Sequence, residues 1–128
     1  MTKELPPIEA IFGDQGGAAI LRLGEHLGKE IQKVNKTQVR KLLTELKGMK
    51  QDEEFPLKIN RFCWVCRYIV AQEKSREFEL LGNYLIAAAK KVAEMDAKKH
   101  FGRLQNLMES VYAHYLYRKE KEEERSNA

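Results

Sequence analysis

Apolar residues recur at spacings of three and four along most of this chain, and that spacing decides the fold class. No segment alternates apolar and polar residues with period two, and no Asn-Gly or Asp-Gly hairpin signal is present. A period near 3.6 buries one face of a helix, whereas a half-buried strand needs period two. The sequence therefore predicts an all-α fold, a compact bundle of about five helices.

Helix boundaries follow from capping residues and from proline. We expect helices over about residues 17–34, 38–50, 57–73, 76–95 and from 97 onward. Thr37, Ser75 and Asp96 are the predicted N-caps, and Pro56 is placed to open the third helix. Residues 1–16, with Pro6 and Pro7, are predicted to form an irregular arm, and the charged residues 119–128 to fray. The 128 residues are expected to form a single helical domain.

The composition and the distribution of apolar residues exclude several classes of protein. Hydrophobic residues make up 43% of the chain and charged residues 33%, the balance of a soluble helical protein. No run of 18 apolar residues exists, so no membrane association is expected. The first residues lack the apolar core of a signal peptide, and we therefore expect a cytoplasmic protein.

Basic residues are clustered although the net charge is only +4. Residues 29–50 hold seven Lys or Arg against two Glu, residues 58–76 hold five against one acid, and residues 90–103 hold five against two. The other segments are acidic. Such clustering favours a polyanionic partner over a solvated helical surface, which is the alternative.

The Cys-x-x-Cys pair of the third predicted helix is expected to be packing. On a helical wheel Cys63 and Cys66 fall within the apolar face, where thiols behave as small hydrophobic groups. A redox pair needs a thiol at a helix N-terminus, and a structural zinc site needs further ligands. The three histidines are scattered along the chain, so no metal and no cofactor are expected.

The opposite face of the same helix gathers Trp64 and Tyr68 between Arg61 and Arg67. Aromatic and arginine side chains are enriched at interaction hot spots, so Trp64 and Tyr68 predict a protein interface. The alternative is that Trp64 packs under another helix of the bundle. In the second helix, Lys36, Arg40 and Lys47 form a basic row beside Thr44, which suits a sugar–phosphate backbone.

No motif indicates catalysis. The stretch GDQGGAA lacks the Gly-Lys-Ser/Thr ending of a phosphate loop, and metalloprotease and serine-hydrolase motifs are absent. We therefore expect that the protein is not an enzyme.

Three stretches in order resemble a known family: TQVRKLLTELK (37–47), LKINRFCWVCR (57–67) and FGRLQNLMESVYAHYLY (101–117). The chain is similar to the small helical subunit of the Csm complex, the type III-A CRISPR effector, over about residues 36–118. Arg61, Cys63 and Cys66 depart from the family pattern, which has leucine, tyrosine and glycine there. The positions that match it are Thr37, Val39, Arg40, Lys41, Leu57, Lys58, Arg67, Glu109, Ala113, Tyr115 and Tyr117.

The resemblance implies a non-catalytic subunit of an antiviral defence complex, present in several stacked copies. Its partners would be the target RNA, the guide–target duplex, other Csm subunits and further copies of itself, with a dimer as one form of the isolated subunit. Contacts to RNA would be to the backbone, because base pairing reads the sequence. The basic positions matched to the family are Arg40, Lys41, Lys58 and Arg67, and charge clustering adds Lys36, Lys47, Arg61 and Arg76.

Two alternatives stay open at this point. The chain could be the small subunit of the related type III-B complex, which is also helical and basic. It could also be a helical adaptor that docks a protein on the Trp64 and Tyr68 face, with incidental charge.

Overall fold

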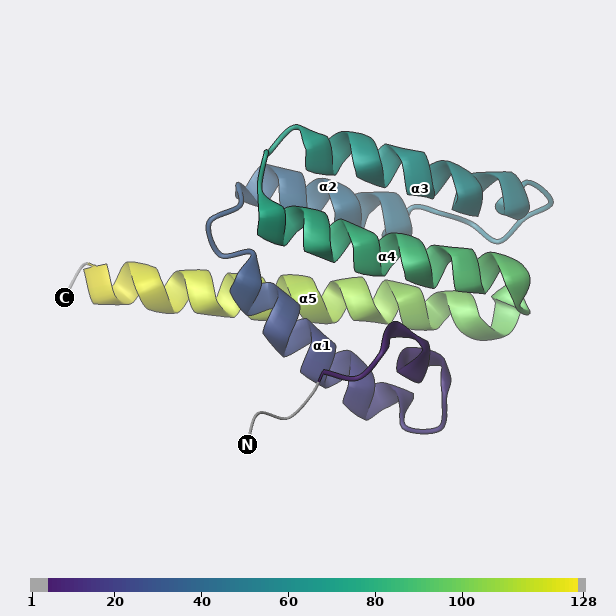
Figure 1. Cartoon of the computed structure of the whole chain (residues 1–128), viewed down its shortest axis with the longest axis horizontal. Coiled ribbons are helices and arrows are strands. Elements are labelled where there is room, and N and C mark those ends of the chain that lie inside the picture. The colour runs from purple at the N-terminus through teal and green to yellow at the C-terminus, as the bar shows by residue number, and fades with distance from the viewer. Residues whose placement is uncertain (1–4, 127–128) are drawn as a thin grey trace.

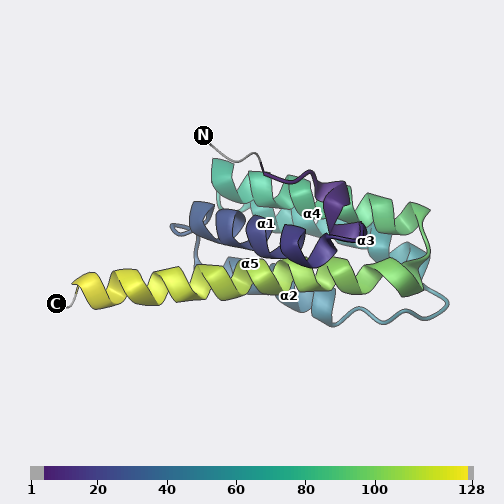
Figure 2. The same ribbon diagram turned by 90° about the horizontal axis from the view of Figure 1, so that it is seen from below.

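Helix α5 (Ala97–Ser126) runs the length of the molecule, and the other elements are arranged around it. In the computed structural model, which describes residues 5–126, α5 contacts α1, α2, α4 and the first short helix. Figures 1 and 2 both show its C-terminal turns extending beyond the rest of the bundle.

The remaining elements are a short 3-10 helix and four α-helices. Their bounds are η1 Ile8–Phe12, α1 Gly16–Glu30, α2 Lys36–Lys47, α3 Phe55–Ala71 and α4 Arg76–Glu94. Helices α3 and α4 pack side by side, α2 lies against α3 and α5, and α1 crosses α5 on the side away from α2 and α3 (Figure 1). No strand is present in the described residues, and the predicted all-α fold is confirmed.

The buried side chains form one connected core. The apolar face of α4, from Phe78 to Val92, is buried. In α1, Ala18 and Leu21 are exposed. The face of α1 that meets α5 is centred instead on Leu23 and Leu27.

Two glycines let α1 approach α5 closely. A Cβ at Gly24 would lie 1.9 Å from Ser110 Oγ and 3.0 Å from the Ser110 carbonyl carbon. At Gly28 it would lie 2.9 Å from the Val111 oxygen. The main chains are therefore closer than any side chain at these two positions would allow.

The helix caps are mostly those predicted. Ser75 Oγ accepts a hydrogen bond from the Phe78 amide at 3.1 Å, and Asp96 Oδ1 accepts one from the Lys98 amide at 3.1 Å. The prediction for α2 is wrong by two positions. Asn35, and not Thr37, is the N-cap, and its side chain accepts from the Thr37 amide at 2.8 Å.

Residues 5–16 are more ordered than an irregular arm. Ile8 and Ile11 of η1 are buried in the core. Arg103 of α5 donates to the carbonyl oxygens of Ile11 at 2.8 Å and Gly13 at 2.6 Å, which holds the end of η1 against the bundle. Long-range contacts of this kind cannot be predicted from the local sequence pattern. The first four residues of the predicted arm lie outside the described residues.

Helix α5 continues through the charged segment to Ser126, and fraying of residues 119–128 stays a prediction. Lys119 lies over the Tyr115 ring at 5.2 Å and Lys121 over the Tyr117 ring at 5.6 Å. Lys121 also pairs with Glu124 at 3.5 Å. Neighbouring turns thus support each other in a segment that buries little. Residues 127–128 lie outside the described residues.

None of the helices in the described part of the chain has the length and apolarity needed to span a bilayer.

Candidate nucleic-acid interface

Helix α2 carries four of the eight predicted RNA-contacting residues, Lys36, Arg40, Lys41 and Lys47, on a broad exposed face. Only Val39, Leu42 and Leu46 are buried in this helix. A narrow apolar stripe attaches it to α5 and α3, and the rest of its surface faces solvent. The helix therefore stands as a ridge between two grooves.

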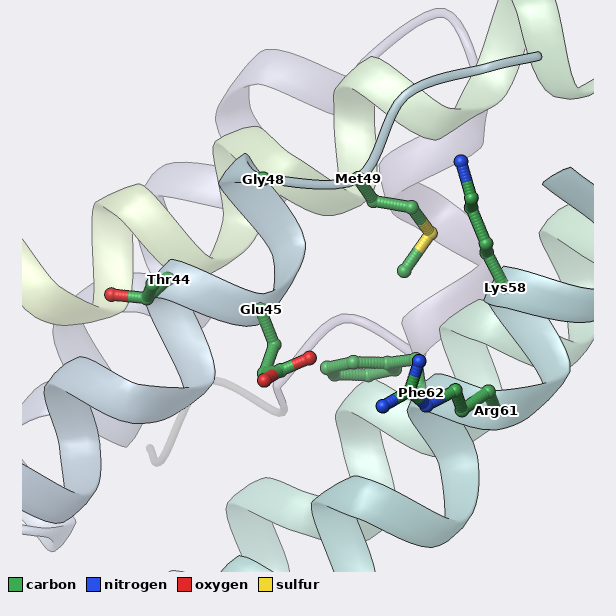
Figure 3. Close-up of a pocket in the computed structure, with 7 residues that line it drawn as sticks. All are labelled: Thr44, Glu45, Gly48, Met49, Lys58, Arg61 and Phe62. Carbon is green, nitrogen blue, oxygen red and sulfur yellow. The ribbon is translucent and has the colours of Figure 1, made fainter. Parts of the chain in front are cut away.

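The first of these, the α2–α3 groove, is lined by Thr37, Arg40, Lys41, Thr44 and Glu45 from α2 and by Val65, Tyr68, Ile69 and Gln72 from α3. It continues past Thr44 and Glu45 into a hollow with Gly48, Met49, Lys58, Arg61 and Phe62 (Figure 3). Glu45 and Arg61 reach into this hollow from opposite helices. A hydrogen bond of 3.2 Å from Gln38 Nε2 to Gln72 Oε1 joins the two helices at the other end.

The second, the α2–α5 groove, lies on the other side of the ridge. It is lined by Lys36, Arg40, Leu43, Thr44, Lys47, Gly48 and Tyr112. The predicted basic row of Lys36, Arg40 and Lys47 is thus one wall of a real groove. Arg40 and Thr44 line both grooves, so they stand at the crest of the ridge.

Some of the cations that line the two grooves are paired with carboxylates, and others are not. Lys47 Nζ lies 3.4 Å from Glu109 Oε1, and Lys58 Nζ lies 2.6 Å from Asp52 Oδ2. The hydrogen bond from Lys58 lowers the pKa of the Asp52 carboxyl group. Within residues 5–126, Lys36, Arg40, Lys41 and Arg61 have no ion-pair partner.

Arg67 and Arg76 lie apart from both grooves. With Lys74, they line a separate hollow at the junction of α3 and α4. Arg67 donates a hydrogen bond of 2.7 Å to Asn83 Oδ1. Lys74 adopts a left-handed conformation with φ of 48°, which reverses the chain between the two helices. The structure therefore does not place all eight predicted cations on one surface.

Trp64 and Tyr68 are exposed to 58% and 68%. The alternative that Trp64 packs under another helix of the same chain is therefore wrong. Tyr68 lines the α2–α3 groove, and Trp64 lies one turn before it on the same helix.

The two cysteines are free thiols in or beside the core. Cys66 is buried and Cys63 half-buried. Burial raises the pKa of Cys66 from 9.0 to about 12, and it also raises the pKa of Cys63. Thiols with raised pKa values are poor nucleophiles and poor metal ligands at neutral pH. In the described part of the chain, no three His, Cys, Asp or Glu side chains gather as metal ligands.

Tyr112 and Glu45 are among the groove residues that the sequence did not predict as site residues. Tyr112 lies at the edge of the apolar stripe of α5, and only the packing of α2 beside it reveals that it lines a groove. Glu45 is the carboxylate that lines the α2–α3 groove, and its effect opposes that of the cations around it. No local sequence signal distinguishes either residue.

The arrangement suits a flexible polyanion. Unpaired arginine and lysine side chains along a helix can neutralise successive phosphates, while threonine hydroxyl groups supply hydrogen bonds without selecting bases. The grooves are open, and their lining residues include no thiol or imidazole group.

Comparison with known proteins gives one match. A family model described as Csm2 Type III-A matches residues 14–121, which includes all of α2 and α3 and α5 as far as residue 121. No curated protein and no solved structure shows significant similarity to the chain. The match decides between the type III-A and type III-B complexes and covers most of the sequence. The chain therefore belongs to the Csm2 family of type III-A CRISPR systems, as a subunit of the Csm effector complex.

Proposed function

We propose that this subunit is non-catalytic and holds the target RNA by its backbone along the guide–target duplex, with the ridge of α2 as the principal contact. The observation that carries the proposal is the set of cations on α2 that have no acidic partner in the described chain, Lys36, Arg40 and Lys41. A cation already paired with a carboxylate gains less from a phosphate than an unpaired one does.

Several copies would repeat the ridge along the duplex. A single ridge offers few phosphate contacts, so its affinity for RNA would be modest. Copies held side by side by other Csm subunits, and by each other, would bind the same strand with much higher effective affinity. In this arrangement the guide supplies the sequence specificity, and the subunit needs to recognise only the shape and charge of the strand.

The test is RNA binding by fluorescence anisotropy across a salt series, comparing the wild-type chain with Arg40→Ala/Lys41→Ala. Because each phosphate contact contributes about 0.7 to the slope of log affinity against log salt for a single strand, the double variant should lose about 1.4 from that slope. Binding should not depend on the RNA sequence.

The matched control is Lys29→Ala/Lys33→Ala, which removes the same charge from the last turn of α1 and from the turn that follows it. That variant should keep the wild-type slope. Equal losses in the two double variants would mean that net charge, and not the ridge, determines binding. No RNA binding by the wild-type chain at low salt would contradict the proposal.

A further inference from the structure

Helix α3 exposes three large apolar side chains on one side. Leu57, Trp64 and Tyr68 are 63%, 58% and 68% exposed, and Arg61 lies between them in the sequence. Residues four and seven apart share a helix face, so these side chains form a continuous stripe. A stripe of this size on a charged helical protein indicates a binding surface.

The stripe borders the basic groove. Tyr68 lines the α2–α3 groove opposite Arg40 and Lys41, and Arg61 lines its continuation. Val65 and Ile69 provide an apolar strip between the helices. The aromatic residues of α3 and the cations of α2, which are predicted on separate helices, therefore belong to one surface.

Two occupants compete for this surface. A helix of a neighbouring subunit, the partner that the sequence predicts for Trp64 and Tyr68, would need a broad apolar floor. Here the apolar strip is narrow, and Arg40, Lys41 and Arg61 beside it have no acidic partner in the described residues. Single-stranded RNA matches both features, because its phosphates pair with cations and its unpaired bases stack on aromatic rings.

We infer that Trp64 and Tyr68 stack on unpaired bases of the target strand while Arg40 and Lys41 hold the adjoining phosphates. The α2–α3 groove therefore takes unpaired positions of the target strand and prefers single-stranded RNA to a fully paired duplex, whose bases are already stacked, while the contacts of the ridge to paired stretches are to the backbone alone. This inference rests on the proposed function and assigns the state of the RNA that this groove binds.

The test uses Trp64 as its own reporter, because it is the only tryptophan in the chain. Three end-labelled probes are titrated into the full chain: oligoadenylate, an RNA duplex, and an abasic ribose–phosphate strand. Binding is followed by label anisotropy and stacking by Trp64 fluorescence, with free tryptophan as the control for absorption. Oligoadenylate should quench Trp64 with the same midpoint as the anisotropy change, and the other two probes should bind more weakly without quenching.

Variants separate stacking from other roles of the stripe. Trp64→Ala should weaken oligoadenylate binding about tenfold, and Trp64→Phe should recover most of that loss, because phenylalanine also stacks. The affinity for the abasic strand should stay unchanged in both variants. Tyr117→Ala removes an equally exposed tyrosine from α5 and should leave all affinities unchanged.

Each contrary result has a distinct meaning. Oligoadenylate binding without quenching, or with unchanged affinity in Trp64→Ala, would overturn the inference and leave the proposed function standing. Unchanged RNA affinity in Trp64→Ala/Tyr68→Ala, together with reduced self-association in sedimentation, would assign the stripe to a protein partner and also overturn it. Failure of all three probes to bind would contradict the proposed function and the inference together.

Discussion

Lys47 of α2 pairs with Glu109 of α5, with 3.4 Å between the ammonium nitrogen and the carboxylate oxygen, whereas Arg40, two turns earlier on the same ridge, has no such partner among residues 5–126. The two cations line the same groove and would be indistinguishable in a helical wheel. This difference in ion pairing predicts that Lys47 and Arg40 contribute differently to RNA binding.

Arg40→Ala should weaken RNA binding several-fold and lower the salt slope by about 0.7, whereas Lys47→Ala should change the affinity by less than about twofold. Glu109→Gln releases Lys47 and should strengthen binding slightly. Anisotropy titrations of the three variants at one low and one high salt concentration measure this ranking. Equal losses for Arg40→Ala and Lys47→Ala would show that the pair does not limit Lys47.

Glu45 is the carboxylate that lines the α2–α3 groove. A negative charge close to bound phosphates weakens binding, so Glu45→Gln should raise RNA affinity about two- to fivefold at low salt and less at high salt. Glu53→Gln, in the loop before α3, is the control for net charge. A loss of affinity in Glu45→Gln would instead mean that this carboxylate positions Arg61 or another groove side chain.

Gly24→Ala and Gly28→Ala should each destabilise the fold by about 1–3 kcal/mol, because the new methyl group meets the main chain of α5. Gly102→Ala is the matched control. A Cβ there meets nothing within 4 Å, and alanine favours a helix over glycine, so this variant should gain about 0.5–1 kcal/mol. Urea unfolding followed by circular dichroism gives all three values. Stability equal to wild type in Gly24→Ala would show that α1 does not sit as close to α5 as described.

The helical fold follows from the sequence because each helix carries its own periodic stripe and most carry a cap. Ser75 and Asp96 cap as predicted, and α4 buries one face of regularly spaced apolar residues. The contacts between distant parts of the chain were not predicted. Ile8 and Ile11 are buried where η1 packs against α1, α4 and α5, and Arg103, about ninety positions along the chain, holds the end of η1 through its main-chain oxygens. Local patterns carry no information about such partners.

The candidate site shows the same division. The basic row on α2 and the aromatic face of α3 were each predicted from the sequence, because spacing along a helix is a local property. The grooves could not be predicted from the sequence. Tyr112 and Arg40 meet in one groove, and Tyr68 and Arg40 in the other, only because α2 packs between α3 and α5. The separation of Arg67 and Arg76 from the ridge has the same origin.

The thiols should behave as core groups. Cys66 is fully buried, so Cys66→Ser should cost about 1–3 kcal/mol by placing a hydroxyl group in the apolar core. Cys63→Ser should cost less than about 1 kcal/mol, because this residue is half-buried and its thiol already faces the Ile59 carbonyl oxygen at 3.7 Å. Urea unfolding measures both changes. Loss of RNA binding in Cys63→Ser with unchanged stability would point to a role outside packing.

Stability should fall at alkaline pH through two buried groups. Burial raises the pKa of Cys66 from 9.0 to about 12 and the pKa of Tyr115 from 10.0 to about 12. Between the lower and the higher pKa value of each group, the group has lost its proton in the unfolded chain but still holds it in the folded chain. The stabilisation from both groups is therefore complete below pH 9 and is lost as the pH rises toward 12, with each group contributing at most about 1.4 kcal/mol per pH unit.

Tyr115→Phe separates the two contributions. The variant lacks the hydrogen bond of 2.6 Å that the Tyr115 hydroxyl group donates to the Val34 carbonyl oxygen, so it should be about 1 kcal/mol less stable at pH 7. It also lacks the titrating group, so its stability should fall less steeply above pH 10 than that of the wild-type chain. The curves of unfolding free energy against pH for the variant and the wild type should therefore converge. Cys66→Ala should show the same convergence from pH 9. Urea unfolding at intervals between pH 7 and pH 12 measures the difference, in which the titration of all shared groups cancels. Parallel curves for Tyr115→Phe and wild type would mean that the Tyr115 hydroxyl group ionises as readily in the folded protein as in the unfolded chain.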